Sequence, residues 1–568
     1  MIIEAAAVPS ETTLTADVCI VGGGAVGISL ALALLEAGVD VLLLESGNDA
    51  QDAATQDLYA GTVADERLHS PPDRYRQRRF GGSTTIWGGR CMPFDPIDFQ
   101  PRDFIAHSGW PIDYRDVLPF YPEANRLCEA GDFAYTVETA FPQPVRELIA
   151  GLPADSAFSS NTLERFSCPT DFGKRYRQRL AQGDARVVLG ANVGTMYLDP
   201  AGRRLRALDV RTLGGNRFRV QARRYVLAAG GLETARLLLA SPGASGRGIG
   251  NAHDVVGRYY MCHLAGTIGT LDLTPAASVW HGYEISDDGV YCRRRLALRP
   301  AVQQRLRVGN FIARLHHPRL TDPAHRTGVL SLLCLAGPFI PYEYAKRLTG
   351  GEPATWRTWL THAGNVLSDI PGITAFLWHW LRHRTLAERK FPSVVVYPRA
   401  PRYSLDFHAE QEPNPDSRVT LEHGSADALG MPRLRVDWRH TRQDVRTVQA
   451  ALAVLAHDVA EAGLGRFLYD PAGVEHEMIR YGAYGGHHIG TARMGADPRS
   501  SVVDANCRVH EVDNLYVAGS AVFPTSSQAN PTLTAVALAL RLAAHLSRQR
   551  AWSASRWQAR NFRRQEGR

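Results

Sequence analysis

The 568-residue sequence lacks several features that mark particular classes of protein. No uninterrupted apolar run reaches the roughly 18 residues that a membrane-spanning helix requires. The 8 cysteines are scattered without a CxxC pair, which argues against a disulfide framework and against a structural zinc site. The N-terminal segment lacks the basic start, apolar stretch and cleavage site of a signal peptide. We therefore expect a cytoplasmic protein with reduced thiols and no metal site.

Outside one short segment, positive and negative charges nearly balance. The net charge is +7, but residues 547–568 contain seven arginines and a single acidic residue, so the rest of the chain is nearly neutral. This distribution argues against a nucleic-acid-binding protein. We interpret residues 547–568 as a basic tail that is either solvated or in contact with an anionic surface or partner. The hydrophobic content of 45% and the length predict a globular protein of two or three domains.

A dinucleotide-binding unit is predicted near the N-terminus. An apolar run at 16–21 precedes a helical pattern at 26–37, and a second apolar run follows at 39–44. The sequence GGGAVG at 22–27 joins the first run to the helix and has the GxGxxG spacing. Its glycines permit a tight turn, close approach to a pyrophosphate and close helix packing. Glu45 ends the second run, where a carboxylate accepts hydrogen bonds from ribose hydroxyls.

Three later segments favour FAD over NAD as the dinucleotide. Glycine-containing turns follow apolar runs at 225–231 and 514–520, and a glycine-rich loop occupies 81–89. An extended FAD contacts more protein than one strand–helix–strand unit provides, and distributed glycine loops suit it. Because these signals lie at both ends of the chain, we expect an interleaved protein of two domains.

Seven segments in order resemble the glucose–methanol–choline (GMC) oxidoreductase family, in the branch with pyranose oxidase and fructose dehydrogenase. The resemblance covers nearly the whole chain. It implies a Rossmann-type α/β FAD-binding domain interleaved with an α+β substrate domain built on a mixed sheet. The segments are GGGAVG (22–27), GGSTTIWGG (81–89), RYVLAAGGLETARLLL (224–239), VGRYYMCH (256–263), EQEPNPDSRVTL (410–421), HHIGTARMG (487–495) and LYVAGSAVFPTSSQANPTLTAVALALRLA (515–543).

The domain boundaries and cofactor contacts follow from these segments. The predicted FAD-binding domain comprises 13–110, 185–275 and 476–546, and the predicted substrate domain comprises 111–184 and 276–475. The residues expected to bind FAD are Gly22, Gly24, Ala25, Val26, Gly27, Glu45, Ser46, Gly81, Gly82, Ser83, Trp87, Gly88, Gly89, Val193, Ala229, Gly230, Gly519, Ser520, Asn530, Pro531 and Thr532.

The resemblance also assigns the chemistry. It implies oxidation of a primary or secondary hydroxyl group by hydride transfer to the flavin, with His487 as the base and Asn530 holding the alcohol oxygen. His488 is the alternative base. A small-molecule alcohol, sugar or glycoside is the expected substrate, and oxygen, a quinone or a redox protein is the expected electron acceptor. Two other readings remain open: a non-redox relative such as a hydroxynitrile lyase, and a flavoprotein subunit that passes electrons to a partner.

Two further expectations concern the flavin, one from local chemistry and one from the resemblance. Asn530 and Pro531 have the residue types of a helix N-cap and first helical position, so a helix at 531–546 would point its positive end at the site. In relatives with covalently bound FAD, a histidine of the glycine loop forms the bond. Ile86 stands at that place here, so we predict non-covalent FAD.

Residues 329–384 are rich in tryptophan and other apolar residues. They are interpreted as core of the substrate domain, or alternatively as a docking face for a subunit, a membrane surface or an apolar substrate.

Overall fold

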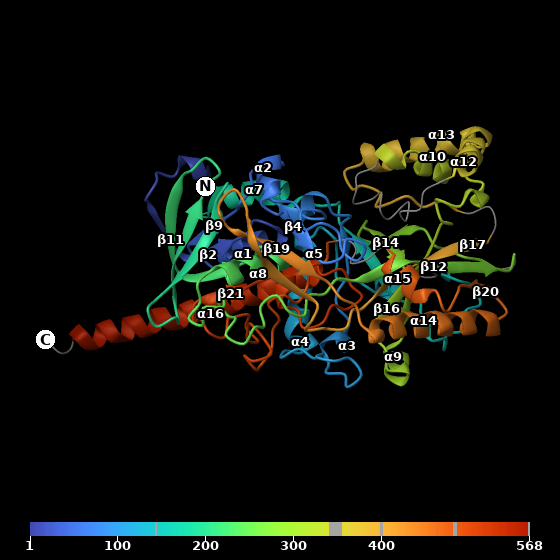
Figure 1. Cartoon of the computed structure of the whole chain (residues 1–568). Helices are drawn as coiled ribbons and strands as arrows, with labels where there is room; N and C mark the ends of the chain where they lie inside the picture. The colour runs from blue at the N-terminus through green and yellow to red at the C-terminus, as the bar shows by residue number, and fades with distance from the viewer. Residues whose placement is uncertain are drawn as a thin grey trace.

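The computed structural model describes the chain except residues 142–144, 184, 276, 340–354, 398–400, 481–485 and 566–568. The side chains of Pro338 and of residues 549–565 also lie outside the described part. Figure 1 shows two bodies side by side, each built on a β-sheet, and a small lobe of helices above the second body. No described helix has the length and apolarity needed to cross a membrane.

The first body contains an eight-stranded sheet. Its central strand β2 pairs in parallel with β3 and with β11, and β21 returns from the end of the chain to pair with β11. Because Val18–Val21 of β2 and all of β3 are buried on both faces, these residues form continuous apolar runs in the sequence. The strands, in sheet order, are β1 (Ile2–Glu4), β8 (Arg186–Leu189), β3 (Val41–Leu44), β2 (Thr13–Val21), β11 (Arg217–Leu227), β10 (Leu205–Arg211) and β9 (Asn192–Leu198), with β21 (Leu515–Val517) beside β11.

Helices cover this sheet and share one core with it. Helix α1 (Ala25–Glu36) packs against α16 (Thr532–Gln565) and α7 (Phe172–Gln182), and α5 (Tyr121–Leu127) packs against α16. The predicted assignment of 111–184 to the substrate domain is therefore wrong for α5 and α7, whose apolar side chains complete the first core. Helix α16 also runs beyond the predicted end at 546, although its side chains in most of the basic tail lie outside the described residues.

The second body is built on a six-stranded sheet whose pairings are all antiparallel. Helix α14 (Arg442–Glu461) packs on it and begins at Thr441, whose hydroxyl accepts a hydrogen bond from Asp444 N in a capping box. Strand β12 belongs here although 185–275 was predicted with the first domain. The strands, in order, are β20 (Gly465–Leu468), β12 (Leu264–Leu273), β17 (Arg402–Ala409), β16 (Phe311–His316), β15 (Leu296–Leu298) and β6 (Phe158–Ser159).

Two small sheets and several short helices complete the described elements. The apolar run at 393–397 is not part of any strand in the described part of the chain. The small sheets are β13 (Tyr283–Ile285), β14 (Tyr291–Arg294), β7 (Leu163–Phe166) and β5 (Arg90–Cys91), and β18 (Arg418–Ala426), β19 (Pro432–Asp437) and β4 (Gly61–Val63); the short helices are α2 (Ala53–Asp57), α3 (Pro96–Phe99), α4 (Tyr114–Val117), α6 (Val137–Ala140), α9 (Pro300–Leu306) and α15 (Val474–Ile479).

The helical lobe consists of α10 (Gly328–Leu335), α12 (Trp356–Ser368) and α13 (Ile370–Trp380). It lies above the six-stranded sheet, at the upper right of Figure 1. Trp356 is 68% exposed and Trp378 is 66% exposed. The interpretation of this segment as buried core is therefore wrong for α12 and α13, which expose large apolar side chains, whereas Val329 and Leu330 of α10 are buried.

Candidate active site

One cavity of ≈ 1090 Å³ runs between the two bodies. One part is lined by the glycine loop after β2, and another by residues of β16 and β17. The cavity thus joins the nucleotide-type sheet to the second sheet, as expected for a cofactor on one side and a substrate on the other.

The first glycine loop is shaped by two close approaches and one open position. Gly22 has φ +113°, and a Cβ there would lie 2.5 Å from Ala228 O. A Cβ on Gly27 would lie 1.9 Å from Gly22 O, so only glycine permits this packing. A Cβ on Gly24 would meet no protein atom within 4 Å and would project into open space. Gly24 caps α1 without a side chain, which leaves the helix N-terminus free for an anionic group.

Glu45 lies at the end of β3 against this loop. Its Oε2 accepts from Gly23 N at 2.6 Å and its Oε1 accepts from Gly47 N at 2.7 Å. Burial raises the pKa of Glu45, and the two N–H donors partly offset this rise. The carboxylate is therefore held in a fixed position at the cavity wall.

Most of the predicted cofactor-binding residues meet at this cavity. Two do not: Gly27 packs under the loop, and Gly81 donates its N–H to Gly23 O at 2.8 Å from behind the wall. The residues that line the cavity are Gly22, Gly24, Ala25, Val26, Glu45, Ser46, Gly82, Ser83, Trp87, Gly88, Gly89, Val193, Ala229, Gly230, Gly519, Ser520, Asn530, Pro531 and Thr532, together with His487.

His487 makes contacts through both ring nitrogens. Its Nδ1 lies 2.7 Å from His263 Nδ1, and its Nε2 lies 3.2 Å from Asn530 Nδ2. His263 Nε2 lies 3.1 Å from Ser526 O. Because a carbonyl only accepts, His263 Nε2 carries the hydrogen, and in the neutral ring its Nδ1 then accepts from His487 Nδ1–H. The lone pair of His487 is consequently on Nε2, beside Asn530 and the cavity.

The same pair is held in the neutral form. Burial lowers the pKa of His487 well below its usual value, and His263 and Arg90 lower it further. Burial also lowers the pKa of His263 to about 4, although the Ser526 carbonyl opposes this shift. A neutral imidazole with a lone pair toward a cavity can accept a proton there. Sequence reasoning missed His263, which ends the VGRYYMCH segment without a pattern of its own.

Asn530 has a different local role from the one predicted. The backbone carbonyl of Pro531 accepts from Ala535 N at 2.8 Å, and α16 begins at Thr532, so the helix cap lies one residue later. The Asn530 side chain does not cap the helix. Its Nδ2 faces His487, and its Oδ1 is buried without a hydrogen-bond partner within the described residues.

His488, the alternative base, is held in another group. Its Nδ1 lies 2.6 Å from the Tyr260 hydroxyl, which also contacts His69 Nε2 at 2.8 Å and Cys262 Sγ at 3.3 Å. The ligand atoms of His69, Cys262 and His488 lie within 4.8 Å of one another, a spacing that could hold a metal ion. The Tyr260 hydroxyl bonds to all three, so hydrogen bonding is sufficient to explain this group. His488 also lines the cavity, but its Nδ1 is engaged by Tyr260.

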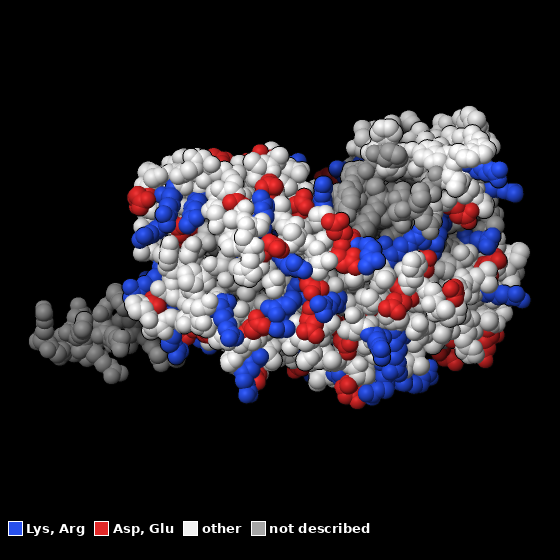
Figure 2. Space-filling model, viewed as in Figure 1, with Lys and Arg blue, Asp and Glu red and all other residues white. Residues whose placement is uncertain are grey.

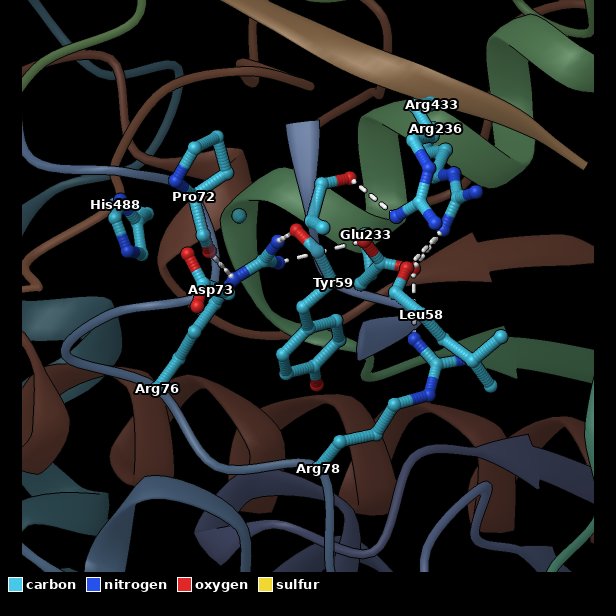
Figure 3. Close-up of polar contacts among 12 residues, drawn as sticks. Leu58, Tyr59, Pro72, Asp73, Arg76, Arg78, Glu233, Arg236, Arg433 and His488 are labelled. Carbon is cyan, nitrogen blue, oxygen red and sulfur yellow. Dashed lines mark hydrogen bonds and ion pairs between the residues drawn. The ribbon is translucent and has the colours of Figure 1, made fainter. Parts of the chain in front are cut away.

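Glu233 on α8 (Gly230–Ala240) is surrounded by three buried arginines that the sequence did not single out. Its carboxylate lies 3.4 Å from Arg76, 3.1 Å from Arg78 and 3.4 Å from Arg236. Figure 3 shows these side chains converging on Glu233, with Tyr59 beneath Arg76. Burial raises the pKa of Glu233, but the three arginines outweigh it and hold the pKa at about 2. Arg76, Arg78 and Glu233 form one charged wall of the cavity.

The far end of the cavity is also polar. It is lined by His317, by Asp406 and His408 on β17, and by Trp380 and Arg384 at the end of the helical lobe. A small molecule beside His487 would meet these groups.

Comparison with known proteins identifies the family of the chain. Residues 413–539 match the family described as GMC oxidoreductase, and residues 17–334, more than half of the chain, match the family described as FAD dependent oxidoreductase. The chain is 26% identical to the fructose dehydrogenase large subunit of Gluconobacter japonicus, over 94% of this chain and 98% of that protein. It is also 26% identical to paromamine 6'-oxidase of Streptomyces fradiae, over 93% and 90% of the two chains.

The solved structure of pyridoxine 4-oxidase from Mesorbium loti has a similar fold, with a TM-score of 0.53 and 19% identity over 93% of this chain and 99% of that one. The family and fold class expected from the sequence are therefore confirmed: the chain belongs to the GMC family of FAD-dependent oxidoreductases.

Proposed function

We propose that this enzyme oxidises a CH–OH group of a sugar, glycoside or similar polyhydroxylated compound, with His487 as the base. One observation carries the proposal. His487 presents the lone pair of its Nε2 to the cavity, 3.2 Å from the Asn530 amide nitrogen, while His263 accepts the hydrogen on its other nitrogen. An alcohol hydroxyl that contacts both side chains would meet one acceptor and one donor.

The residues at the cavity fit FAD. The open sides of Gly24, Gly88 and Gly230 would let the cofactor approach the backbone, since a Cβ on any of them would enter empty space. Glu45 would hold the ribose hydroxyls, and the N-terminus of α1 would face the pyrophosphate. The N-terminus of α16, at Thr532, would place its positive end toward the flavin and stabilise its reduced form.

The residues of the chain divide the chemistry between them. His487 Nε2 takes the hydroxyl proton, and Asn530 Nδ2 donates to the alcohol oxygen as negative charge develops there. His263 Nδ1 holds the His487 Nδ1 hydrogen, so that the tautomer remains correct as the ring becomes charged. FAD, when bound, supplies the acceptor for the hydride that leaves the carbinol carbon. Loss of one proton and one hydride converts the alcohol to a carbonyl compound.

The substrate class rests on the cavity and on the relatives. His317, Asp406 and His408 offer hydrogen-bonding groups beyond the histidine pair, as a polyhydroxylated molecule requires. The names of two relatives, fructose dehydrogenase and paromamine 6'-oxidase, indicate sugar and aminoglycoside substrates for those proteins.

Non-covalent attachment of the flavin is part of the proposal. Ile86 lines the cavity at the place of the loop histidine and offers only carbon atoms. Acid precipitation of the purified protein should therefore release all the flavin into the supernatant. Yellow colour retained in the pellet would contradict this assignment.

The test of the whole proposal is anaerobic reduction. Candidate sugars and glycosides are added to the purified yellow protein, and bleaching of the main flavin band identifies a substrate. The variant His487→Ala should bind FAD but lose most of the reduction rate, whereas His488→Ala should retain more of it. Reoxidation by air, a quinone or a redox protein then identifies the electron acceptor. Unchanged reduction in His487→Ala would overturn the role of His487.

A further inference from the structure

Helix α12 of the lobe exposes its large apolar side chains, whereas a helix on the surface of a soluble protein usually buries them. Trp356, Leu360 and Leu367 are exposed, at the i, i+4, i+11 spacing of one helix face, and Leu367 is 73% exposed. The polar residues face inward instead. His362 Nδ1 lies 3.0 Å from Ser331 Oγ of α10, and Asn365 donates to Pro323 O at 2.9 Å.

Helix α13 continues this surface. Ile370, Leu377 and Trp378 are exposed along it, and Leu381 follows at its end. Figure 2 shows the lobe as a projection at the upper right whose outer surface is almost entirely uncharged. We call the exposed apolar side chains of α12 and α13 the lobe face. Soluble proteins rarely expose so many large apolar side chains together unless something covers them.

The charged residues of the segment that carries the lobe face are mostly positive. Residues 355–386 contain Arg357, Arg382 and Arg384, whereas Asp369 is their single acidic residue. Asp369 is engaged, because its carboxylate accepts from Gly328 N at 2.8 Å. Arg357 and Arg382 are exposed beside the tryptophans. Tryptophan and arginine together suit the boundary between acyl chains and anionic headgroups.

We propose that the lobe face lies on an anionic lipid surface, with α12 and α13 parallel to that surface. The apolar side chains would enter the boundary of the acyl chains, and Arg357 and Arg382 would contact the phosphates. A lipid surface fits better than a protein partner because exposed apolar side chains lie along both helices, and within residues 355–386 three arginines stand against a single acidic residue. This proposal does not depend on the substrate or on the role of His487.

Docking would also orient the catalytic cavity. Trp380 and Arg384 line the far end of the cavity and follow directly from the lobe face. The cavity end would therefore lie close to the lipid surface.

The test is sedimentation of the full-length, FAD-loaded protein with sucrose-loaded vesicles. Vesicles of phosphatidylcholine alone are compared with vesicles that also contain phosphatidylglycerol, at low and high salt. We expect binding to the anionic vesicles that weakens with salt, because the headgroup contacts are exposed and screened. The triple variant Trp356→Ser, Leu360→Ser, Trp378→Ser should bind on the order of a hundredfold more weakly.

Two controls distinguish vesicle binding through the lobe face from nonspecific adsorption. The triple variant Leu213→Ser, Ile285→Ser, Leu468→Ser removes exposed apolar side chains elsewhere and should bind vesicles as the wild type does. Arg357→Gln with Arg382→Gln should weaken binding to anionic vesicles only. Flavin absorbance and thermal unfolding show that each variant is folded.

Three results would overturn the proposal. One is that the wild type binds neither kind of vesicle. Another is that the lobe triple variant and the control triple variant lose binding equally. The third is that analytical ultracentrifugation without vesicles detects a dimer that the lobe triple variant abolishes, which would assign the lobe face to a second copy of the chain.

Discussion

His263 and His487 meet through their Nδ1 atoms, 2.7 Å apart, although they are 224 residues apart in the sequence. The Ser526 carbonyl on the far side of His263 decides which ring donates. The contact therefore leaves Nε2 of His487 without a hydrogen, facing Asn530, and makes His263 a positioning residue for the proposed base.

Replacing His263 tests this arrangement. His263→Phe removes the acceptor and should lower the flavin reduction rate about ten- to a hundredfold, as loss of a partner that orients a histidine does elsewhere. His263→Asn keeps a carbonyl oxygen as acceptor and an amide donor for Ser526 O, so it should recover most of the rate. Stopped-flow reduction at saturating substrate measures both. Equal losses in the two variants would indicate a merely structural role.

Removing the amide of Asn530 should affect the transition state more than substrate binding. Asn530→Ala deletes the donor 3.2 Å from His487 Nε2 and should lower kcat on the order of a hundredfold, with a smaller effect on KM. Steady-state kinetics and the visible spectrum of the variant measure activity and FAD content separately. A change in KM alone would show that Asn530 only binds substrate.

The buried histidines predict how stability changes with pH. In the unfolded chain a histidine titrates near 6.5, whereas burial lowers the pKa of folded His263 to about 4. As pH falls from about 6.5 to 4, the unfolded chain takes up a proton that the folded chain does not, so the free energy of unfolding falls. The loss from this one group is about 1.4 kcal/mol per pH unit.

Urea unfolding of wild type and His263→Asn across this pH range isolates the contribution of His263. The comparison is needed because burial raises the pKa of Asp98 to about 8, which stabilises the fold as pH falls from 8 toward 4. The variant should lose stability less steeply below pH 6.5. If the unfolding free energies of the two proteins changed in parallel with pH, His263 would take up its proton equally in the folded and unfolded states.

Gly24 tests the fit of the cofactor. A Cβ on Gly24 would enter the open cavity without touching protein, so Gly24→Ala should leave folding intact and weaken FAD binding about tenfold or more. Gly364 also has open space around it but lies on α12, far along the chain from the glycine loop, so Gly364→Ala is the matched control. FAD titration of the apoprotein gives both affinities. Unchanged affinity in Gly24→Ala would place the cofactor elsewhere.

Glu233 should be far more important to stability than an exposed carboxylate. Glu233→Gln leaves three buried arginines without their shared counter-charge and should cost about 3–5 kcal/mol of unfolding free energy. Glu388→Gln changes an exposed residue and should be nearly neutral. Urea unfolding in saturating FAD measures both. A near-neutral Glu233→Gln would show that water or the cofactor compensates the arginines.

Local sequence patterns predicted the elements that depend on neighbouring residues. The alternation of apolar run, glycine turn and helical pattern predicted β2, α1 and β3. Apolar content was misleading at 329–384, which was interpreted as core although α12 and α13 expose large apolar side chains. Composition gives the side chains that are present, but not whether they face the core or the solvent.

The sequence by itself determined the dinucleotide loop, because this loop depends on a short motif with fixed geometry, and its resemblance to a family indicated the FAD-dependent class and the expectation that His487 and Asn530 act together. Only the tertiary structure decided that His263 orients His487, that three arginines share Glu233, and that the apolar side chains of α12 point outward. Each of these depends on contacts between segments far apart in the chain. Such contacts arise when two separately patterned sheets and their helices pack together, and no local period encodes them.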